Sequence, residues 1–274
     1  MEMKRRFLSL PVFVVLLLIV FVYYSTVFVF IEEWLSLKSS HGLLNSLIFT
    51  FFAAMILSSY ATAILRDPGR VPYGLVPDIE GSNDNINGPK ETGAHKRYCE
   101  KCCHHKPPRA HHCRVCRRCV LRMDHHCIWI NNCVGHGNYR PFLVSVLYSG
   151  IASTYSMVIF LCNTLQKYDQ FSTLAYNVFY VFCGAIIVSL CLVLDSLLGW
   201  QIYLLCRNMT TIEYRAGVRA KWLAKKAGQN YHHPYDLGVC KNLNSVLGQN
   251  MLMWVCPISS GHRSDGIHFP TSRD

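Results

Sequence analysis

Residues 98–133 read YCEKCCHHKPPRAHHCRVCRRCVLRMDHHCIWINNC, and this stretch decides how the middle of the chain folds. Between Cys99 and Cys133 it contains eight cysteines and six histidines. The stretch shows neither a helical nor a strand period, and it cannot bury a hydrophobic core of its own. Bound metal must therefore supply its folding energy.

The cysteine spacing indicates two zinc sites. Cys99–Cys102 and Cys113–Cys116 are CxxC knuckles, whose tight turns direct two thiolates at one ion. Four further donors lie in the same stretch: His112, Cys119, His126 and Cys133. Two sites of three cysteines and one histidine each would use all these side chains. Spacing alone does not decide which donor joins which ion.

Six side chains remain after that count: Cys103, His104, His105, His111, His125 and Cys127. If His126 binds zinc and residues 124–127 are extended, alternate side chains point to opposite sides, so His125 and Cys127 share the face away from the metal. An imidazole beside a thiol can take its proton and leave a nucleophilic thiolate. Asp124 could support His126 or, by turning, orient His125, and the spacing favours neither.

A competing interpretation makes Cys127 a zinc ligand and leaves Cys119 or Cys133 spare. The surroundings of Cys127 favour chemistry instead. Trp129 adds an apolar wall, and a long apolar run begins at Pro141, about fourteen residues after the thiol. We therefore expect this thiol at the membrane surface, where a fatty acyl thioester can reach it.

The rest of the chain has the composition of a membrane protein, with 274 residues, 51% apolar, and a mean hydropathy of +0.19. Four stretches are long enough to span a bilayer: Phe7–Ile31, Gly42–Leu65, Pro141–Gln166 and Ala175–Cys206. The first is too long for a signal peptide and is interpreted as a retained helix. The fourth carries one charge, Asp195, which is a functional candidate by default.

The basic residues predict the orientation. Of 27 Lys and Arg residues, all except Lys38 and Lys167 lie before the first run, between the second and third, or after the fourth. The positive-inside rule then places both termini and the Cys/His stretch in the cytosol. The formal charge of +11 is therefore assigned to loops beside anionic lipid, and no nucleic acid is expected as a partner. Cytosolic thiols stay reduced, which favours metal binding or catalysis over disulfides.

The chain divides into five predicted segments. They are 1–66 with two membrane helices, 67–94 as a linker, 95–140 as the Cys/His domain, 141–206 with two more membrane helices, and 207–274 as a tail. Residues 208–226 of the tail favour a short helix with a basic face. The apolar patch 251–258 is expected either in the membrane interface or packed on the protein body.

Several motifs resemble one known family, the DHHC-type protein S-acyltransferases, or palmitoyltransferases. Residues 98–142 match its cysteine-rich domain in the order and spacing of the CxxC, KPPRAHHC, CxxCxxC, DHHC, NNCVG and NY elements. Residues 67–69 resemble its DPG motif and 210–213 its TTxE motif. The stretch 235–248 resembles its C-terminal motif, with Asn242 at the asparagine position.

The resemblance implies an all-α polytopic membrane protein, with four transmembrane helices and a small irregular two-zinc domain on the cytosolic side. It implies one structural zinc on Cys99, Cys102, His112 and Cys119. It implies the second zinc on Cys113, Cys116, His126 and Cys133. Neither ion would touch Cys127.

The resemblance also implies the chemistry. Cys127 would accept an acyl group from a long-chain acyl-coenzyme A such as palmitoyl-coenzyme A. It would then pass the group to a cysteine of a membrane-associated protein. His125 would act as the base and Asp124 would orient it. Ile128 stands where the family most often has proline, which implies a looser turn and raises a question about rate and partner choice.

The resemblance assigns supporting roles outside the core as well. Thr211 and Glu213 would tie the tail to the Cys/His domain, a role compatible with capping the tail helix. Asn242 would be structural. Small residues at 149, 150, 152 and 153 would leave room for an acyl chain or, as the favoured reading, allow close helix packing. Family habit and rather short membrane runs favour the Golgi or another endomembrane, with the plasma membrane as an alternative.

Two rival functions remain. One is a membrane-anchored zinc module that recruits partners without catalysis, and the other is a catalytically inactive relative. The surplus pair of His125 and Cys127 argues against the first, because a scaffold needs neither group. The intact sequence Asp124–Cys127 argues against the second.

Overall fold

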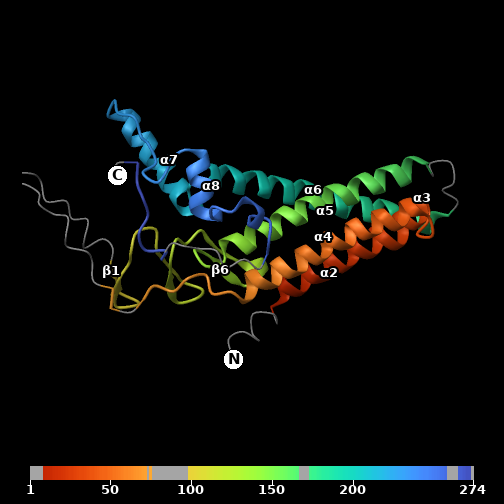
Figure 1. Cartoon of the computed structure of the whole chain (residues 1–274), viewed down its shortest axis with the longest axis horizontal. Coiled ribbons are helices and arrows are strands. Elements are labelled where there is room, and N and C mark those ends of the chain that lie inside the picture. Colours follow the sequence, from red (N-terminus) through yellow and green to blue (C-terminus); the bar gives the residue numbers. More distant parts are fainter. Residues whose placement is uncertain (1–8, 73, 76–97, 167–172, 258–264, 273–274) are drawn as a thin grey trace, which may run out of the picture.

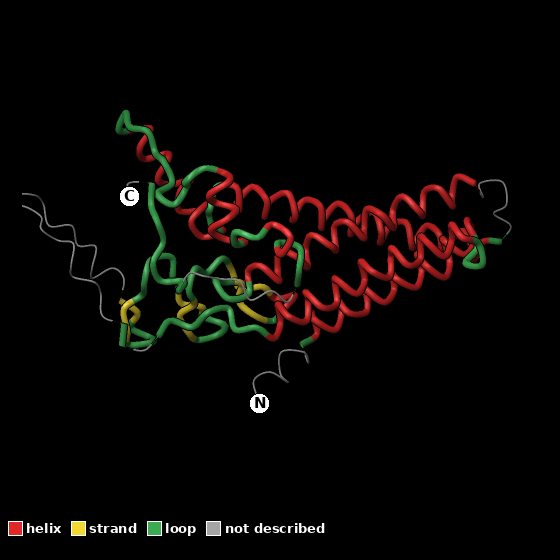
Figure 2. Tube along the Cα trace, in the orientation of Figure 1, coloured by secondary structure: helices red, strands yellow, loops and turns green. Residues whose placement is uncertain are grey.

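The computed structural model describes residues 9–72, 74–75, 98–166, 173–257 and 265–272. A bundle of long helices forms one end of the molecule, and the short strands and the C-terminal helices lie together at the other end (Figures 1 and 2). Of the predicted linker 67–94, residue 73 and residues 76–94 lie outside the described residues.

Within the described residues, four helices are long and apolar enough to cross a membrane, as the sequence predicted. The first, Leu10–Leu35, consists of α2 (Leu10–Tyr24), a π-helical turn η1 (Ser25–Ile31) and α3 (Glu32–Leu35). The others are α4 (Ser40–Leu65), α5 (Tyr139–Gln166) and α6 (Leu174–Cys206). Both the helix content and the four spans therefore agree with the predicted fold class.

Polar contacts supplement apolar packing between the helices. Thr26 and Ser156 share a hydrogen bond of 2.7 Å between their hydroxyls, and the Tyr155 hydroxyl donates to the Asn45 amide oxygen. Inside hydrocarbon such groups have no water to bind, so side chains from neighbouring helices satisfy one another. These bonds help to fix how η1 and α4 lie against α5.

Asp195 lies on the exposed side of α6, where Thr154 donates a 2.9 Å hydrogen bond to its carboxylate. A Cβ at Gly150 would come within 2.9 Å of the same carboxylate, so Gly150 allows α5 and α6 to approach at this level. Ala152 lies elsewhere on α5, buried in an apolar cluster with Phe49 of α4. Gly150 thus serves close packing, the favoured alternative for the small residues.

The Cys/His segment folds into three antiparallel hairpins. They pair β1 (Tyr98–Cys99) with β2 (His104–His105), β3 (His111–Cys113) with β4 (Arg118–Val120), and β5 (His125–Cys127) with β6 (Asn132–Val134). Each strand has only two or three residues. Strands of this length are too short to show a two-residue period, so no strand was predicted in this segment.

The segment after α4 lies across this domain. The amide of Leu121 donates to the Gly69 carbonyl (2.9 Å), and the amide of Gly137 donates to the Pro68 carbonyl (3.0 Å). A Cβ at Gly137 would lie 2.3 Å from the carbonyl oxygen of Asp67, so only glycine allows this approach. The DPG segment thereby attaches the end of α4 to the second and third hairpins.

The tail contains α7 (Thr211–Lys226), α8 (Val239–Leu247) and a short turn, η5 (Met251–Met253). Thr210 caps α7, and its capping box with Glu213 explains why the helix begins there rather than at residue 208. Helix α8 was not predicted. Asn242, fully buried, donates to the Cys206 carbonyl (2.8 Å) and so ties α8 to the end of α6.

Candidate active site and metal centres

Two clusters of three cysteines and one histidine form between successive hairpins. One contains Cys99, Cys102, His112 and Cys119, and the other contains Cys113, Cys116, His126 and Cys133. In register, His112 lies opposite Cys119 and His126 lies opposite Cys133. Each of these strand pairs is completed by a CxxC knuckle at the turn of the preceding hairpin. The second hairpin therefore contributes to both clusters.

The spacing of the donor atoms fits zinc. From His112 Nδ1, the sulfurs of Cys99, Cys102 and Cys119 lie at 3.5, 3.2 and 3.9 Å. From His126 Nδ1, the three sulfurs of the other cluster lie at 3.5 to 3.6 Å. A tetrahedral ion with usual bond lengths separates sulfur from nitrogen by about 3.6 Å. Each cluster can therefore hold one metal ion with all four positions filled by protein.

The opposite face of β5 carries the predicted acid–base pair. The Nδ1 atom of His125 lies 2.6 Å from Asp124 Oδ2, and Cys127 interacts with the same imidazole. The spacing allowed Asp124 to pair with either His125 or His126, and in the structure it pairs with His125. Because Nδ1 is engaged with the carboxylate, Nε2 is the nitrogen that remains for the thiol. Cys127 belongs to neither metal cluster.

The first turn of α7 holds the Asp124 carboxylate. Thr211 donates its backbone N–H to Oδ1 and its hydroxyl to Oδ2, both at 2.8 Å. Nearby, Glu213 accepts two bonds from Arg109, at 2.7 and 2.8 Å, in a buried ion pair. The tail is thus bonded to the Cys/His domain through both residues that the TTxE resemblance indicated.

The charges of Asp124 and His125 stabilise each other. Burial favours a higher pKa for Asp124, but the bonds from His125 and Thr211 outweigh burial and hold that pKa below its ordinary value. Burial favours a lower pKa for His125, but Asp124 and Cys127 raise it to about 9. A cationic imidazole can stabilise negative charge that develops on a neighbouring atom during a reaction.

The third hairpin is seated on the end of α4. Asn132, which lies opposite Cys127, donates its side-chain amide to carbonyls of Ala63, Ile64 and Arg66 at 3.1 to 3.3 Å. These carbonyls have no helical partner at a helix end, so the amide caps α4. The bonds place the Cys127 strand at the mouth of the membrane bundle.

Cys127 is 8% exposed and packs in an apolar cluster that includes Tyr60 and Phe142. The following residue, Ile128, is 57% exposed and begins a single 3₁₀ turn. Tyr60 holds that turn by donating its hydroxyl to the Trp129 carbonyl, at 2.6 Å. A membrane helix therefore supports the backbone where the family most often has proline.

The sequence reasoning gave no individual role to Arg109, Asn132 or Tyr60. Arg109 and Asn132 stand within the motifs KPPRAHHC and NNC, which were used only as landmarks. Tyr60 lies in an apolar run and carries no signal of its own. Of the remaining candidates, Cys103 is exposed, and His104 and His105 belong to β2.

Known proteins resemble this chain over most of its length. The family model of DHHC palmitoyltransferases matches residues 93–217. "Probable protein S-acyltransferase 16" of Arabidopsis thaliana is 50% identical over 277 residues, which cover 99% of this chain and 96% of that protein. "Probable protein S-acyltransferase 15" of the same plant is 49% identical over 255 residues, 93% of this chain and 99% of that protein. "Palmitoyltransferase ZDHHC3" of Rattus norvegicus is 30% identical over 211 residues, which cover 73% of this chain and 69% of that protein.

The fold, the paired Cys/His clusters and these similarities define a multi-pass membrane enzyme of the acyltransferase class. The chain belongs to the DHHC palmitoyltransferase family, whose members compared above are protein S-acyltransferases. The family resemblance inferred from the motifs is thereby confirmed.

Proposed function

We propose that Cys127 carries the acyl group between a long-chain acyl-coenzyme A and a cysteine of a membrane-associated protein, in two successive transfers. The observation that carries this proposal is the contact of one imidazole, that of His125, with both the Asp124 carboxylate and Cys127, none of which belongs to a metal cluster. The apolar cluster around Cys127 supports it, since a fatty acyl thioester must reach the sulfur from the bilayer.

In the first transfer the Cys127 thiol gives its proton to His125, and the thiolate attacks the carbonyl carbon of the acyl thioester. The bond from that carbon to the coenzyme A sulfur breaks, and the leaving thiolate takes the proton from His125. In the second transfer the roles reverse. The acceptor cysteine gives its proton to His125 and attacks the acyl-Cys127 thioester, and Cys127 leaves as a thiolate.

Asp124 would act by positioning. Its carboxylate holds the Nδ1 side of the imidazole and stabilises the imidazolium that forms in each transfer. Thr211 in turn holds that carboxylate, so the first turn of α7 takes part in orienting the base.

The two zinc ions would be structural. Cys99, Cys102, His112 and Cys119 would hold one, and Cys113, Cys116, His126 and Cys133 the other. With four protein donors each, neither site keeps a position for substrate. The ions would stabilise hairpins too small to fold on a hydrophobic core.

The orientation, location and domain division are parts of the same proposal. By the positive-inside rule, the basic loops favour a cytosolic location for both termini and the Cys/His domain. The Golgi or another endomembrane is favoured over the plasma membrane. The five segments are those given above, 1–66, 67–94, 95–140, 141–206 and 207–274.

The test is acylation of the purified chain. Incubation with labelled palmitoyl-coenzyme A should give hydroxylamine-labile label on the wild type and none on Cys127→Ser. The matched control is Cys103→Ser, which removes an exposed cysteine outside both metal clusters and should keep the label. Zinc content should be unchanged in both variants. Label that persists in Cys127→Ser, or zinc lost from it, would contradict the assignment.

A further inference from the structure

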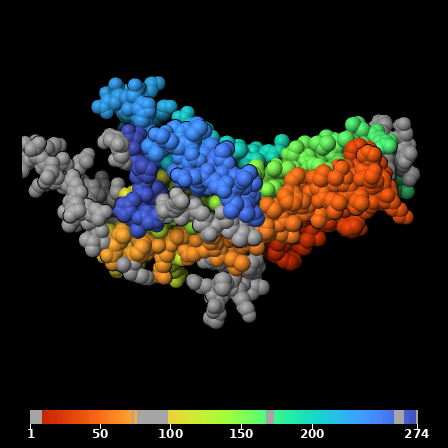
Figure 3. Space-filling model, viewed as in Figure 1, coloured from red at the N-terminus to blue at the C-terminus, as the bar shows by residue number. Residues whose placement is uncertain are grey.

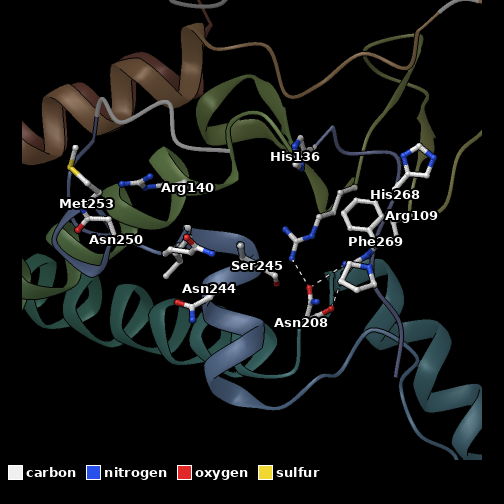
Figure 4. Close-up of a pocket in the computed structure, with 16 residues that line it drawn as sticks. Arg109, His136, Arg140, Asn208, Asn244, Ser245, Asn250, Met253, His268 and Phe269 are labelled. Carbon is white, nitrogen blue, oxygen red and sulfur yellow. Dashed lines mark hydrogen bonds between the residues drawn. The ribbon is translucent and has the colours of Figure 1, made fainter. Parts of the chain in front are cut away.

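A cavity of about 600 Å³ lies between the Cys/His domain, the start of α5, helix α8 and the tail (Figure 4). Arg109, Asn208 and Phe269 line one end, and Arg140 and Asn250 line the other. Asp124, His125 and Cys127 are not among its lining residues. The cavity is therefore a separate feature from the face of β5 that carries the acid–base pair.

The lining is basic. Three arginines, Arg109, Arg122 and Arg140, contribute to it, and within the described part of the chain no aspartate or glutamate does. Glu213 neutralises Arg109 from outside the cavity. Asparagines and a serine of the lining add neutral hydrogen-bonding groups at the surface of α8 and the following loop.

Arg122 carries a buried positive charge. It is 5% exposed, its Nη2 lies 3.3 Å from the Asn208 side-chain oxygen, and it stacks on the Tyr139 ring at 5.1 Å. Burial lowers its pKa to about 10, so it remains charged at neutral pH. Among the described residues it forms no ion pair, because the nearby carboxylates of Glu213 and Asp124 are held by other groups. A buried guanidinium without a paired anion is unfavourable, and a bound anion would offset that cost.

The mouth of the cavity lies beside the membrane helices. Arg140 belongs to the first turn of α5, and Met253 of η5 lines the same end. Next to Met253, the side chains of Met251 and Leu252 are 67% and 85% exposed. Cys256, a few residues on, lies close enough to Tyr148 of α5 to affect it electrostatically. Exposed apolar side chains close to α5 suit a segment in the bilayer interface. In the space-filling view the tail packs over the strand end of the molecule (Figure 3).

We propose that this cavity binds a phosphate-bearing ligand, with a phosphorylated lipid headgroup of the adjacent leaflet as the source that its position favours. Arginine is the residue best suited to phosphate, because its planar guanidinium donates two parallel hydrogen bonds. Basic pockets at the level of the headgroups are suited to anionic lipids. The inference concerns binding and does not depend on the proposed acyl transfer.

The test measures binding to the full chain in nanodiscs. One arm uses phosphatidylcholine nanodiscs with a fluorescent phosphatidylinositol phosphate as probe, and the other adds soluble inorganic pyrophosphate as competitor. Ser245→Glu places a carboxylate in the cavity without removing a buried group, and Gln229→Glu makes the same charge change at the exposed end of α7. We expect binding at least about tenfold weaker in Ser245→Glu and unchanged in Gln229→Glu.

The two arms of the experiment distinguish a lipid headgroup from a free phosphate as the bound ligand. Lipid binding that pyrophosphate does not displace supports a headgroup, and displacement by pyrophosphate supports a site that also takes a free phosphate. Absence of binding in both arms overturns the proposal, as does equal binding by Ser245→Glu and the wild type. Arg122→Gln, checked for zinc content and thermal unfolding, gives a second measurement and should weaken binding as well. Label on Cys127 is scored separately, so failure of one proposal is distinguishable from failure of the other.

Discussion

The hydroxyl of Thr211 provides a sharp test of how the Asp124 carboxylate is held. Thr211→Val keeps the shape of the side chain and the backbone N–H bond to Asp124 Oδ1, but removes the hydroxyl bond to Oδ2, which measures 2.8 Å. Asp124 is 1% exposed, so water cannot replace the lost donor. A hydrogen bond to a charged group contributes roughly 1.5–3 kcal/mol.

If that energy is expressed in the transfer step, the rate of Cys127 acylation should fall about tenfold to a hundredfold. The assay is the initial rate of label transfer from palmitoyl-coenzyme A at saturating donor, with thermal unfolding measured in parallel. Thr211→Ser retains the hydroxyl and should stay within about threefold of the wild type. The reasoning is refuted if Thr211→Val transfers at the wild-type rate, or if Thr211→Ser falls as far as Thr211→Val.

Three further predictions concern the supports of the site. Glu213→Gln leaves Arg109 buried without its charged partner, so the free energy of unfolding should fall by about 3 kcal/mol. Unchanged thermal stability would contradict this prediction. Cys119→Ser should lose at least one zinc ion, measured by metal analysis, and its acylation activity, measured by the label on the protein. Two retained zinc ions would contradict the ligand assignment. If the small residues of α5 leave room for an acyl chain, Ala152→Phe should shift acyl-coenzyme A preference to shorter chains, whereas Ile151→Phe on the exposed side of α5 should not. An unchanged chain-length profile in Ala152→Phe would support close helix packing alone.

Much of this fold was readable from the sequence because its signals are strong. Membrane helices are specified by long runs without charge, and all four appeared close to where they were predicted. The metal donors were recognisable because CxxC knuckles have a fixed local geometry. Their grouping was not readable from spacing, since it depends on which hairpin lies next to which, and only the resemblance suggested the sets that the structure brings together.

Other features depend on contacts between distant segments. Helix α8 forms against the end of α6, where Val246 and Leu247 join the apolar cluster of Leu205, so its stability comes from packing that no local pattern records. The bond from Tyr60 to the Trp129 carbonyl joins residues 69 positions apart. The resemblance indicated that Thr211 ties the tail to the Cys/His domain, but its partner there, Asp124, became apparent only from the fold.

Helix α6 and the threonine that holds the Asp124 carboxylate are directly joined in the chain. Helix α6 ends at Cys206, and Thr211 follows after only four residues, so α6 can tilt little without moving the threonine that holds Asp124. Helices adjust their tilt to the thickness of the bilayer around them. Acyl transfer by this chain is therefore expected to vary with the length of the surrounding lipid tails, which would tune the enzyme to the membrane in which it resides.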